Sequence, residues 1–213
     1  MSPPPSSPRR PGRPRSTDVD SREKLLAAAL LAFSELGFAG ASLRAIAVSA
    51  GFDVAMIFHH FGSKEGLWQA VVESMAADFQ ASLAHELLPL IQGEGPLVQR
   101  VTQVLDIFMD KLVQRPTLTL LIMRETSLPG ERRDFLVAQL LGPSCERFSP
   151  FWQEAMEAGV LRRSDPVLFH VGIFGAMAMI LAFRPILPSL GAAEMDLAEL
   201  KAHIHRGLLA DAV

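Results

Sequence analysis

Cationic side chains occur in two places where they are suited to contact a polyanion. Lys64 follows Ser63 in what should be the first turn of a helix, where a cation opposes the helix dipole, so it calls for an anionic partner. The formal net charge is −3, and acidic residues outnumber basic ones beyond Trp68. The first sixteen residues carry no acid and four arginines, namely Arg9, Arg10, Arg13 and Arg15. A basic anchor on an acidic body is therefore expected, with local charge governing phosphate attraction.

No residue spacing in the chain is typical of catalysis. There is no Ser/His/Asp order, glycine-rich phosphate loop or HExxH-type pair, so no enzyme is predicted. His203 and His205 would point apart on a helix, so neither a metal site nor a cofactor is expected. Cys145 is the only cysteine, which excludes an intrachain disulfide and fits a reducing cytoplasm. Its thiol is expected to be buried and structural.

The segment Arg22–Trp68 should position the cationic groups through a series of capped helices. Apolar residues recur at three- and four-residue steps up to Gly37, which is expected to end the first helix. Ser42, Asp53 and Ser63 are suitable N-caps for a second, third and fourth helix. Two short helices joined by a tight corner form a helix-turn-helix module, whose second helix enters the major groove of DNA.

The rest of the chain keeps a helical pattern, and hardly any stretch alternates with the period of a strand. An all-α fold is therefore predicted. The fourth helix should run from Lys64 to about Leu88, where Pro89 breaks it. The later helices are expected at Pro96–Val113, Pro116–Ser127, Glu131–Ala158, Pro166–Phe183 and Glu194–Ala210.

The apolar stretch Val167–Phe183 reaches the short limit of a membrane-spanning helix. It contains His170 and ends abruptly at Arg184, so a buried helix in a soluble assembly is the preferred interpretation, with no membrane partner. The N-terminus is rich in proline and arginine and has no apolar run, so it does not resemble a secretory signal. A cytoplasmic location is expected.

The segment Arg22–Trp68 resembles the N-terminal DNA-binding domain of the TetR family of bacterial transcriptional regulators. The resemblance covers about a quarter of the chain and holds without a gap. The matching residues are Ala28–Ala29, Phe33, Glu35, Gly37–Phe38, Ser42, Ile46–Ala47, Ala50–Gly51, Phe58, His60–Phe61 and Ser63–Lys64–Glu65. It implies a DNA-binding domain (19–79, with its motif at 42–61) and a helical ligand-binding and dimerisation domain (80–213). The preceding segment (1–18) is expected to be a disordered basic arm, because its proline-, serine- and arginine-rich composition cannot bury enough apolar surface to fold alone.

The resemblance also implies how such a protein works. Family members look like two-fold dimers whose paired third helices enter successive major grooves. A small molecule in the C-terminal domain moves the fourth helix, and most members are repressors released by their ligand. We therefore expect a ligand-responsive regulator that binds a two-fold operator in double-stranded DNA as a homodimer and responds to a small apolar molecule. A repressor is expected because most family members are repressors.

Two departures weaken the expected DNA contacts. Phe58 stands where the family usually has a tyrosine, and the start of the third helix is apolar. Val54 and Met56 can contact thymine methyl groups but cannot form bidentate hydrogen bonds with bases. This keeps open the alternative of a small-molecule-binding or scaffolding helical protein with a weakened DNA-reading head. The predicted DNA-binding residues are Arg9, Arg10, Arg13, Arg15, Ser42, Arg44, Val54, Met56, His59, His60 and Lys64.

The body offers candidates for a ligand pocket and a dimer seam. Phe108, Met123, Arg124, His170, Phe174 and Met177 are the predicted pocket residues, because apolar walls with a few polar groups suit a small ligand. Small residues that allow close helix approach favour a dimer seam formed by Phe148, Trp152, Met156, Gly172, Gly175 and Met179. An intrachain core explains either set equally well.

Overall fold

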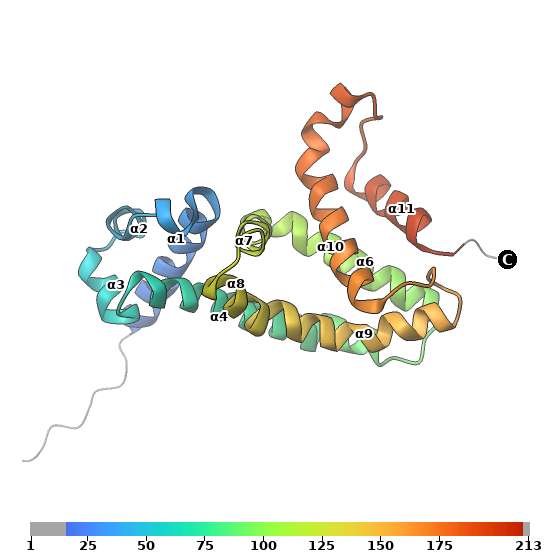
Figure 1. Ribbon diagram of the computed structural model, residues 1–213, viewed down its shortest axis with the longest axis horizontal. Helices are drawn as coiled ribbons and strands as arrows, with labels where there is room; N and C mark the ends of the chain where they lie inside the picture. The colour runs from blue at the N-terminus through green and yellow to red at the C-terminus, as the bar shows by residue number, and fades with distance from the viewer. Residues whose placement is uncertain (1–15, 211–213) are drawn as a thin grey trace, which may run out of the picture.

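The computed structural model describes residues 16–210 and shows a small helical head joined to a longer helical body (Figure 1). Over these residues the only β-structure is an isolated bridge between Leu161 and Leu209, so the predicted all-α fold is confirmed. The head comprises α1 (Ser16–Gly40), α2 (Leu43–Ser49), α3 (Val54–Phe61) and the start of α4 (Lys64–Ser82). The body adds η1 (Leu83–Leu87), α5 (Leu88–Ile91), α6 (Leu97–Gln114), α7 (Pro116–Thr126), α8 (Glu131–Leu136), η2 (Val137–Leu141), α9 (Gly142–Glu157), α10 (Pro166–Phe183), η3 (Arg184–Leu190) and α11 (Leu197–Leu208).

The predicted caps begin the helices of the head. The Ser42 side chain accepts from the backbone nitrogen of Ala45, and Asp53 does the same for Ala55. Ser63 caps α4 through the nitrogen of Gly66. The helix α1 is interrupted at Gly37, where φ is 72°, a conformation that favours glycine. Because α1 begins at Ser16, the last residues of the predicted 1–18 arm are helical.

A compact apolar core holds the head helices together. Its largest fully buried side chains include Phe33, Ile46, Ile57 and Trp68, which come from all four helices. Leu121 of α7 and Leu136 of α8 belong to the same core, so the head is sealed in part by helices of the body. The domain boundary expected after residue 79 therefore does not coincide with the edge of this core, because residues beyond it complete the core.

The fourth helix does not break at Pro89. After α4 the chain widens into the π-helical turn η1 and continues as α5, which carries Pro89 in its first turn. The same arrangement recurs at η2, directly before Gly142 and Pro143 of α9. Proline lacks an N–H and its ring clashes with the carbonyl four residues earlier, and a widened turn relieves both problems. Each proline is thereby accommodated without ending the helix.

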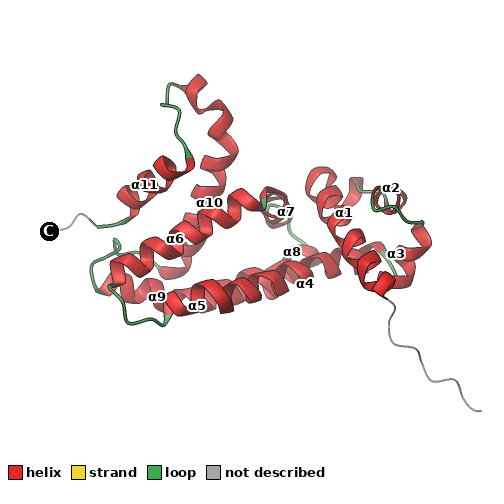
Figure 2. Cartoon of the chain, turned by 180° about the vertical axis from the view of Figure 1, so that it is seen from behind, coloured by secondary structure: helices red, strands yellow, loops and turns green. Residues whose placement is uncertain are grey.

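The body surrounds a second core in which α6, α9 and α10 meet around Phe108, Phe148 and Trp152. Figure 2 shows that α10 rises from this core and that α11 lies beside it. By length and composition alone, Pro166–Leu190 could cross a membrane, with a mean hydropathy of 2.1. Only 22% of its apolar window is buried inside the protomer, so the expected burial is not achieved within one chain.

Candidate nucleic-acid interface

The helix α3 turns one face to the head core and leaves the other free. Ile57 is fully buried and anchors the helix, and Val54 and Met56 are half-buried against the same core. The outward face carries Phe58, which is 52% exposed, and His59. Only the parts of the Val54 and Met56 side chains that the core leaves uncovered can therefore make the predicted contacts with bases.

His60 is half-buried and makes a hydrogen bond inside the head. Its Nε2 lies 2.9 Å from the hydroxyl oxygen of Ser21, a buried residue of α1. The hydrogen bond ties the C-terminal end of α3 to α1. A phosphate contact of His60 stays a prediction, and it would have to use the part of the ring that Ser21 leaves uncovered. His59 keeps its exposed position.

The other predicted contacts of the head lie around the entrances to α2 and α4. Ser42 and Arg44 are exposed at the start of α2. The Lys64 ammonium donates to the carbonyl oxygen of Ala39 over 3.4 Å and lies 4.8 Å from the ring centroid of Phe38. The predicted arm residues Arg9, Arg10, Arg13 and Arg15 lie outside the described residues.

The body contacts the head at the corner that follows Gly37. The guanidinium of Arg132 in α8 lies 4.2 Å from the centroid of Phe38, and its Nε donates to Glu125 over 3.0 Å. A side chain at Gly37 would collide with the guanidinium of Arg124 from α7. The sequence pattern did not predict the Arg132 contact, because nothing local links two residues so far apart in the chain.

Four of the six predicted pocket residues come together. Phe108, His170 and Phe174 pack with ring centroids 4.5 to 5.9 Å apart, and the buried Met177 belongs to the same core. Burial lowers the pKa of His170 to about 4, so its imidazole is neutral near pH 7. Within this core Phe174 is only half-buried.

Met123 and Arg124 do not join this cluster, which corrects the prediction for both. The side chain of Met123 is 42% exposed, and Arg124 is turned toward Gly37 of the head. Both lie on α7, the helix that packs against α1. The direction of their side chains depends on the rotation of α7 about its own axis, and the apolar pattern of this short helix does not predict that rotation.

The predicted dimer seam divides into a buried half and an exposed half. Phe148, Trp152 and Met156 are buried in the core of the protomer, so they leave no surface for a partner. This corrects the prediction for α9. The remaining three, Gly172, Gly175 and Met179, are exposed on α10.

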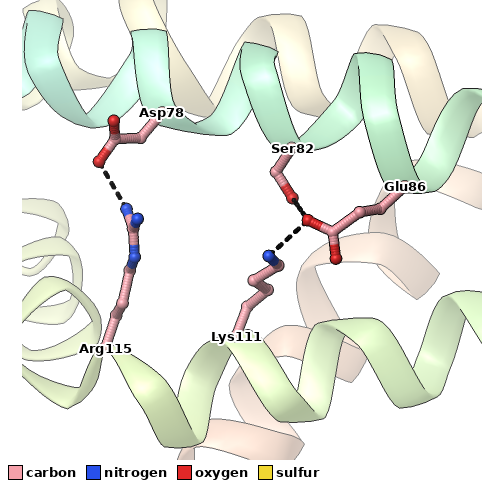
Figure 3. A network of polar contacts seen from close by, with 5 residues as sticks. All are labelled: Asp78, Ser82, Glu86, Lys111 and Arg115. Atoms are coloured by element: carbon pink, nitrogen blue, oxygen red, sulfur yellow. Dashed lines mark hydrogen bonds and ion pairs between the residues drawn. The ribbon is translucent and has the colours of Figure 1, made fainter.

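Two ion pairs connect α4 and η1 with Lys111 of α6 and with Arg115, which follows α6 (Figure 3). Arg115 Nη1 lies 2.6 Å from Asp78 Oδ2, and Lys111 Nζ lies 2.6 Å from Glu86 Oε1. The hydrogen bond from Lys111 lowers the pKa of Glu86, with a further contribution from Ser82. Beside Arg115, an open cleft of about 370 Å³ is lined by residues of α1, α4 and the α6–α7 corner. These pairs bridge the helix that leaves the head and the start of the body.

A capped helix-turn-helix head on a helical body defines a DNA-binding regulator. The family model for bacterial regulatory proteins of the tetR family matches residues 25–71. The repressor NicS of Pseudomonas putida is 30% identical over 152 residues, which cover 70% of this chain and 69% of NicS. The chain therefore belongs to the TetR family and is a transcriptional regulator, not an enzyme.

Other similarities agree with this assignment. The regulatory protein RaaS of Mycobacterium tuberculosis is 42% identical over 73 residues, and this match spans only 34% of either chain. The hemolysin II regulator HlyIIR shares the fold, with a TM-score of 0.69 and 21% identity over 91% of this chain and 99% of that one. AibR in complex with isovaleryl coenzyme A and operator DNA has a TM-score of 0.66 at 21% identity, over 89% and 97% of the chains.

Proposed function

We propose that this regulator binds a two-fold DNA operator as a homodimer and represses transcription until a small apolar molecule binds its body. The observation that carries DNA binding is the free outer face of α3, held by the buried Ile57 and flanked by the exposed Arg44 and by Lys64. A recognition helix held in this way can enter the major groove while the flanking cations contact phosphates. The similarity to the repressor NicS supports repression rather than activation.

The homodimer is supported by the apolar face of α10. Leu168 is 70% exposed and Val171 is 57% exposed, next to the exposed Gly172 and Gly175. Large exposed apolar patches mark interaction surfaces, and small residues allow two helices to approach closely. A second copy is the fitting occupant, because a two-fold operator requires a two-fold protein and α10 lies far from the DNA-binding head (Figure 1).

The effector site is proposed between α6, α9 and α10. The half-buried Phe174 covers Phe108 and His170 at the edge of the body core. A small apolar molecule that displaces the Phe174 ring would meet aromatic walls and the flexible side chain of Met177, which suit such a ligand. That AibR was solved with an acyl coenzyme A ester supports an effector with an apolar acyl group.

Operator binding can be tested by fluorescence anisotropy with duplexes from beside the protein's own gene. We expect a duplex with half-sites about one helical turn apart to bind more tightly than its scrambled counterpart. The affinity should fall steeply with added salt. If the protein binds no duplex at low ionic strength better than an acidic control protein does, the proposed function is wrong.

The dimer can be tested by light scattering on the double variant Leu168→Glu, Val171→Glu. We expect the wild type to have the mass of a dimer and the variant that of a monomer with unchanged helicity, since buried carboxylates oppose association. Leu128→Glu is the matched control, because Leu128 is similarly exposed but lies outside α10. A monomeric wild type, or one that binds lipid vesicles through α10, would contradict the dimer.

A further inference from the structure

We infer that Arg132 is a positioning residue for DNA binding, because it holds Lys64 in place through the ring of Phe38. The inference rests on the proposed phosphate contact of Lys64. It adds a second way for a movement of the body to reach the DNA contact, one that does not pass along α4, since Arg132 belongs to α8. The three residues come from α8, the α1 corner and the first turn of α4.

Lys64 is restrained by the head and is not a freely moving surface lysine. Its side chain is half-buried, with the ammonium 4.8 Å from the ring centroid of Phe38. This lies within the distance over which a cation is attracted to an aromatic face. The same ammonium donates to the carbonyl oxygen of Ala39. Because both partners lie in one corner of α1, the position of that corner sets the position of the charge.

Phe38 is in turn contacted by the body. Arg132 brings a second cation to the ring at 4.2 Å. Phe38 also stacks on Phe33, which is fully buried in the head core, with 5.8 Å between ring centroids. The ring therefore has one fixed neighbour inside the head and one cationic neighbour outside it. A shift of Arg132 changes the balance of forces on the same ring that attracts Lys64.

Arg132 is itself fixed by Glu125 of α7. The Nε of Arg132 donates to Glu125 over 3.0 Å, and the Glu125 side chain is only 6% exposed. A buried carboxylate strongly retains its ionic partner, because loss of that partner leaves an uncompensated charge. The chain of contacts therefore runs from a buried group of the body to a cation that faces the DNA. A ligand that rotates α7 or α8 would move Arg132 and, through Phe38, the ammonium of Lys64.

The experiment compares Lys64→Met, Arg132→Met and the double variant with the wild type in operator binding over a salt series. Methionine keeps an apolar stem and removes the charge. We expect Lys64→Met to weaken binding and reduce the salt slope by about 0.9, the loss of one phosphate contact. Arg132→Met should weaken binding by about 3- to 10-fold, within the range for a cation–aromatic contact. The double variant should bind no more weakly than Lys64→Met.

Arg133→Met is the matched control, because Arg133 is the neighbouring arginine and bonds with the adjacent Asp134. It should bind like the wild type. Additive losses from Lys64→Met and Arg132→Met would mean that Arg132 contacts DNA directly, which overturns the inference. Unchanged binding by Arg132→Met would overturn it as well. Unchanged binding by Lys64→Met would instead refute the proposed phosphate contact of Lys64.

A fold-stability control separates positioning from general damage. Glu125→Gln removes the negative charge that holds Arg132 without altering the ring or either cation. It should lower operator affinity in the same direction as Arg132→Met. Urea unfolding of each variant identifies any that fail to fold. If Arg132→Met is unfolded, the Glu125→Gln result decides: wild-type affinity in that variant contradicts the inference.

Discussion

Trp152 of α9 donates its indole N–H to Nδ1 of His170 in α10 over 3.1 Å. Because Nδ1 accepts this hydrogen bond, the neutral ring carries its proton on Nε2. That atom lies 2.9 Å from the Ser144 hydroxyl and donates to it. His170 is thus held between two residues of α9 in a single tautomer. The contact joins the body core to the helix that carries the proposed dimer face.

Replacement of His170 by alanine should destabilise the protein strongly. The change removes a buried ring that stacks on Phe148 and leaves the Trp152 N–H without its acceptor. Cavity formation together with a buried unpaired donor should cost about 2 to 5 kcal/mol. Urea unfolding at fixed protein concentration measures this. The exposed His203 is the control, and His203→Ala should change stability by less than about 0.5 kcal/mol.

Stability should also depend on pH through His170. Burial lowers the pKa of this imidazole from 6.5 to about 4, so the unfolded chain takes up a proton more readily than the folded one. The stabilising contribution is complete above pH 6.5 and declines as the pH falls toward 4, by about 3 kcal/mol at 1.36 kcal/mol per pH unit. Urea unfolding of the wild type and His170→Gln across this range should show a steeper decline in the wild type than in the variant. Equal slopes would assign it to other groups.

The Asp78–Arg115 and Glu86–Lys111 ion pairs should contribute little to stability (Figure 3). Asp78, Glu86 and Arg115 are each about half exposed, so solvent and salt screen the attraction. We expect Lys111→Met combined with Arg115→Met to lower the free energy of unfolding by no more than about 1 kcal/mol at low salt. The difference from the wild type should vanish in 1 M NaCl, as judged by urea unfolding. A larger loss that persists there would point to packing.

The head could be predicted in detail because its signals are local. Ser42, Asp53 and Ser63 each satisfy nitrogens a few residues away, so cap chemistry alone places the starts of α2, α3 and α4. The same local rule fails at Pro89. Proline predicts a helix end, but a π-helical turn absorbs the missing hydrogen bond.

The partners of the body residues could not be predicted from the sequence. Trp152 and His170 fit a dimer seam, a pocket or a core equally well, since each needs only an apolar neighbour and a hydrogen bond. The structure brings them together within one protomer. The sequence does not predict the contact of Arg132 with Phe38 either, because a charged residue in the first turn of a helix is ordinarily solvated.

Phe58→Tyr should strengthen operator binding. Phe58 is 52% exposed on the free face of α3, at the position where TetR-family proteins usually carry a tyrosine. An added hydroxyl can donate to a phosphate oxygen, and a hydrogen bond to a charged group contributes about 1.5 to 3 kcal/mol at most. Anisotropy titration should show a gain of several-fold, with unfolding unchanged. Phe52→Tyr is the control, because Phe52 packs partly against the head core.

Asp53 should oppose DNA binding through its charge and support the head through its cap. Its carboxylate accepts from the backbone nitrogen of Ala55 over 2.8 Å, yet it is exposed at the start of α3 and would face DNA phosphates. Asparagine retains a capping oxygen without the charge, whereas alanine loses both. Asp53→Asn should therefore bind the operator more tightly at low salt with nearly unchanged stability.

Asp53→Ala separates the two effects of that side chain. It should lose about 1 kcal/mol of unfolding free energy, the usual cost of a missing N-cap. Its operator affinity should lie below that of Asp53→Asn, because a frayed first turn of α3 positions the recognition helix less well. Urea unfolding and anisotropy titration over a salt series measure both quantities. Equal or weaker binding by Asp53→Asn than by the wild type would show that the carboxylate does not face phosphate in the complex.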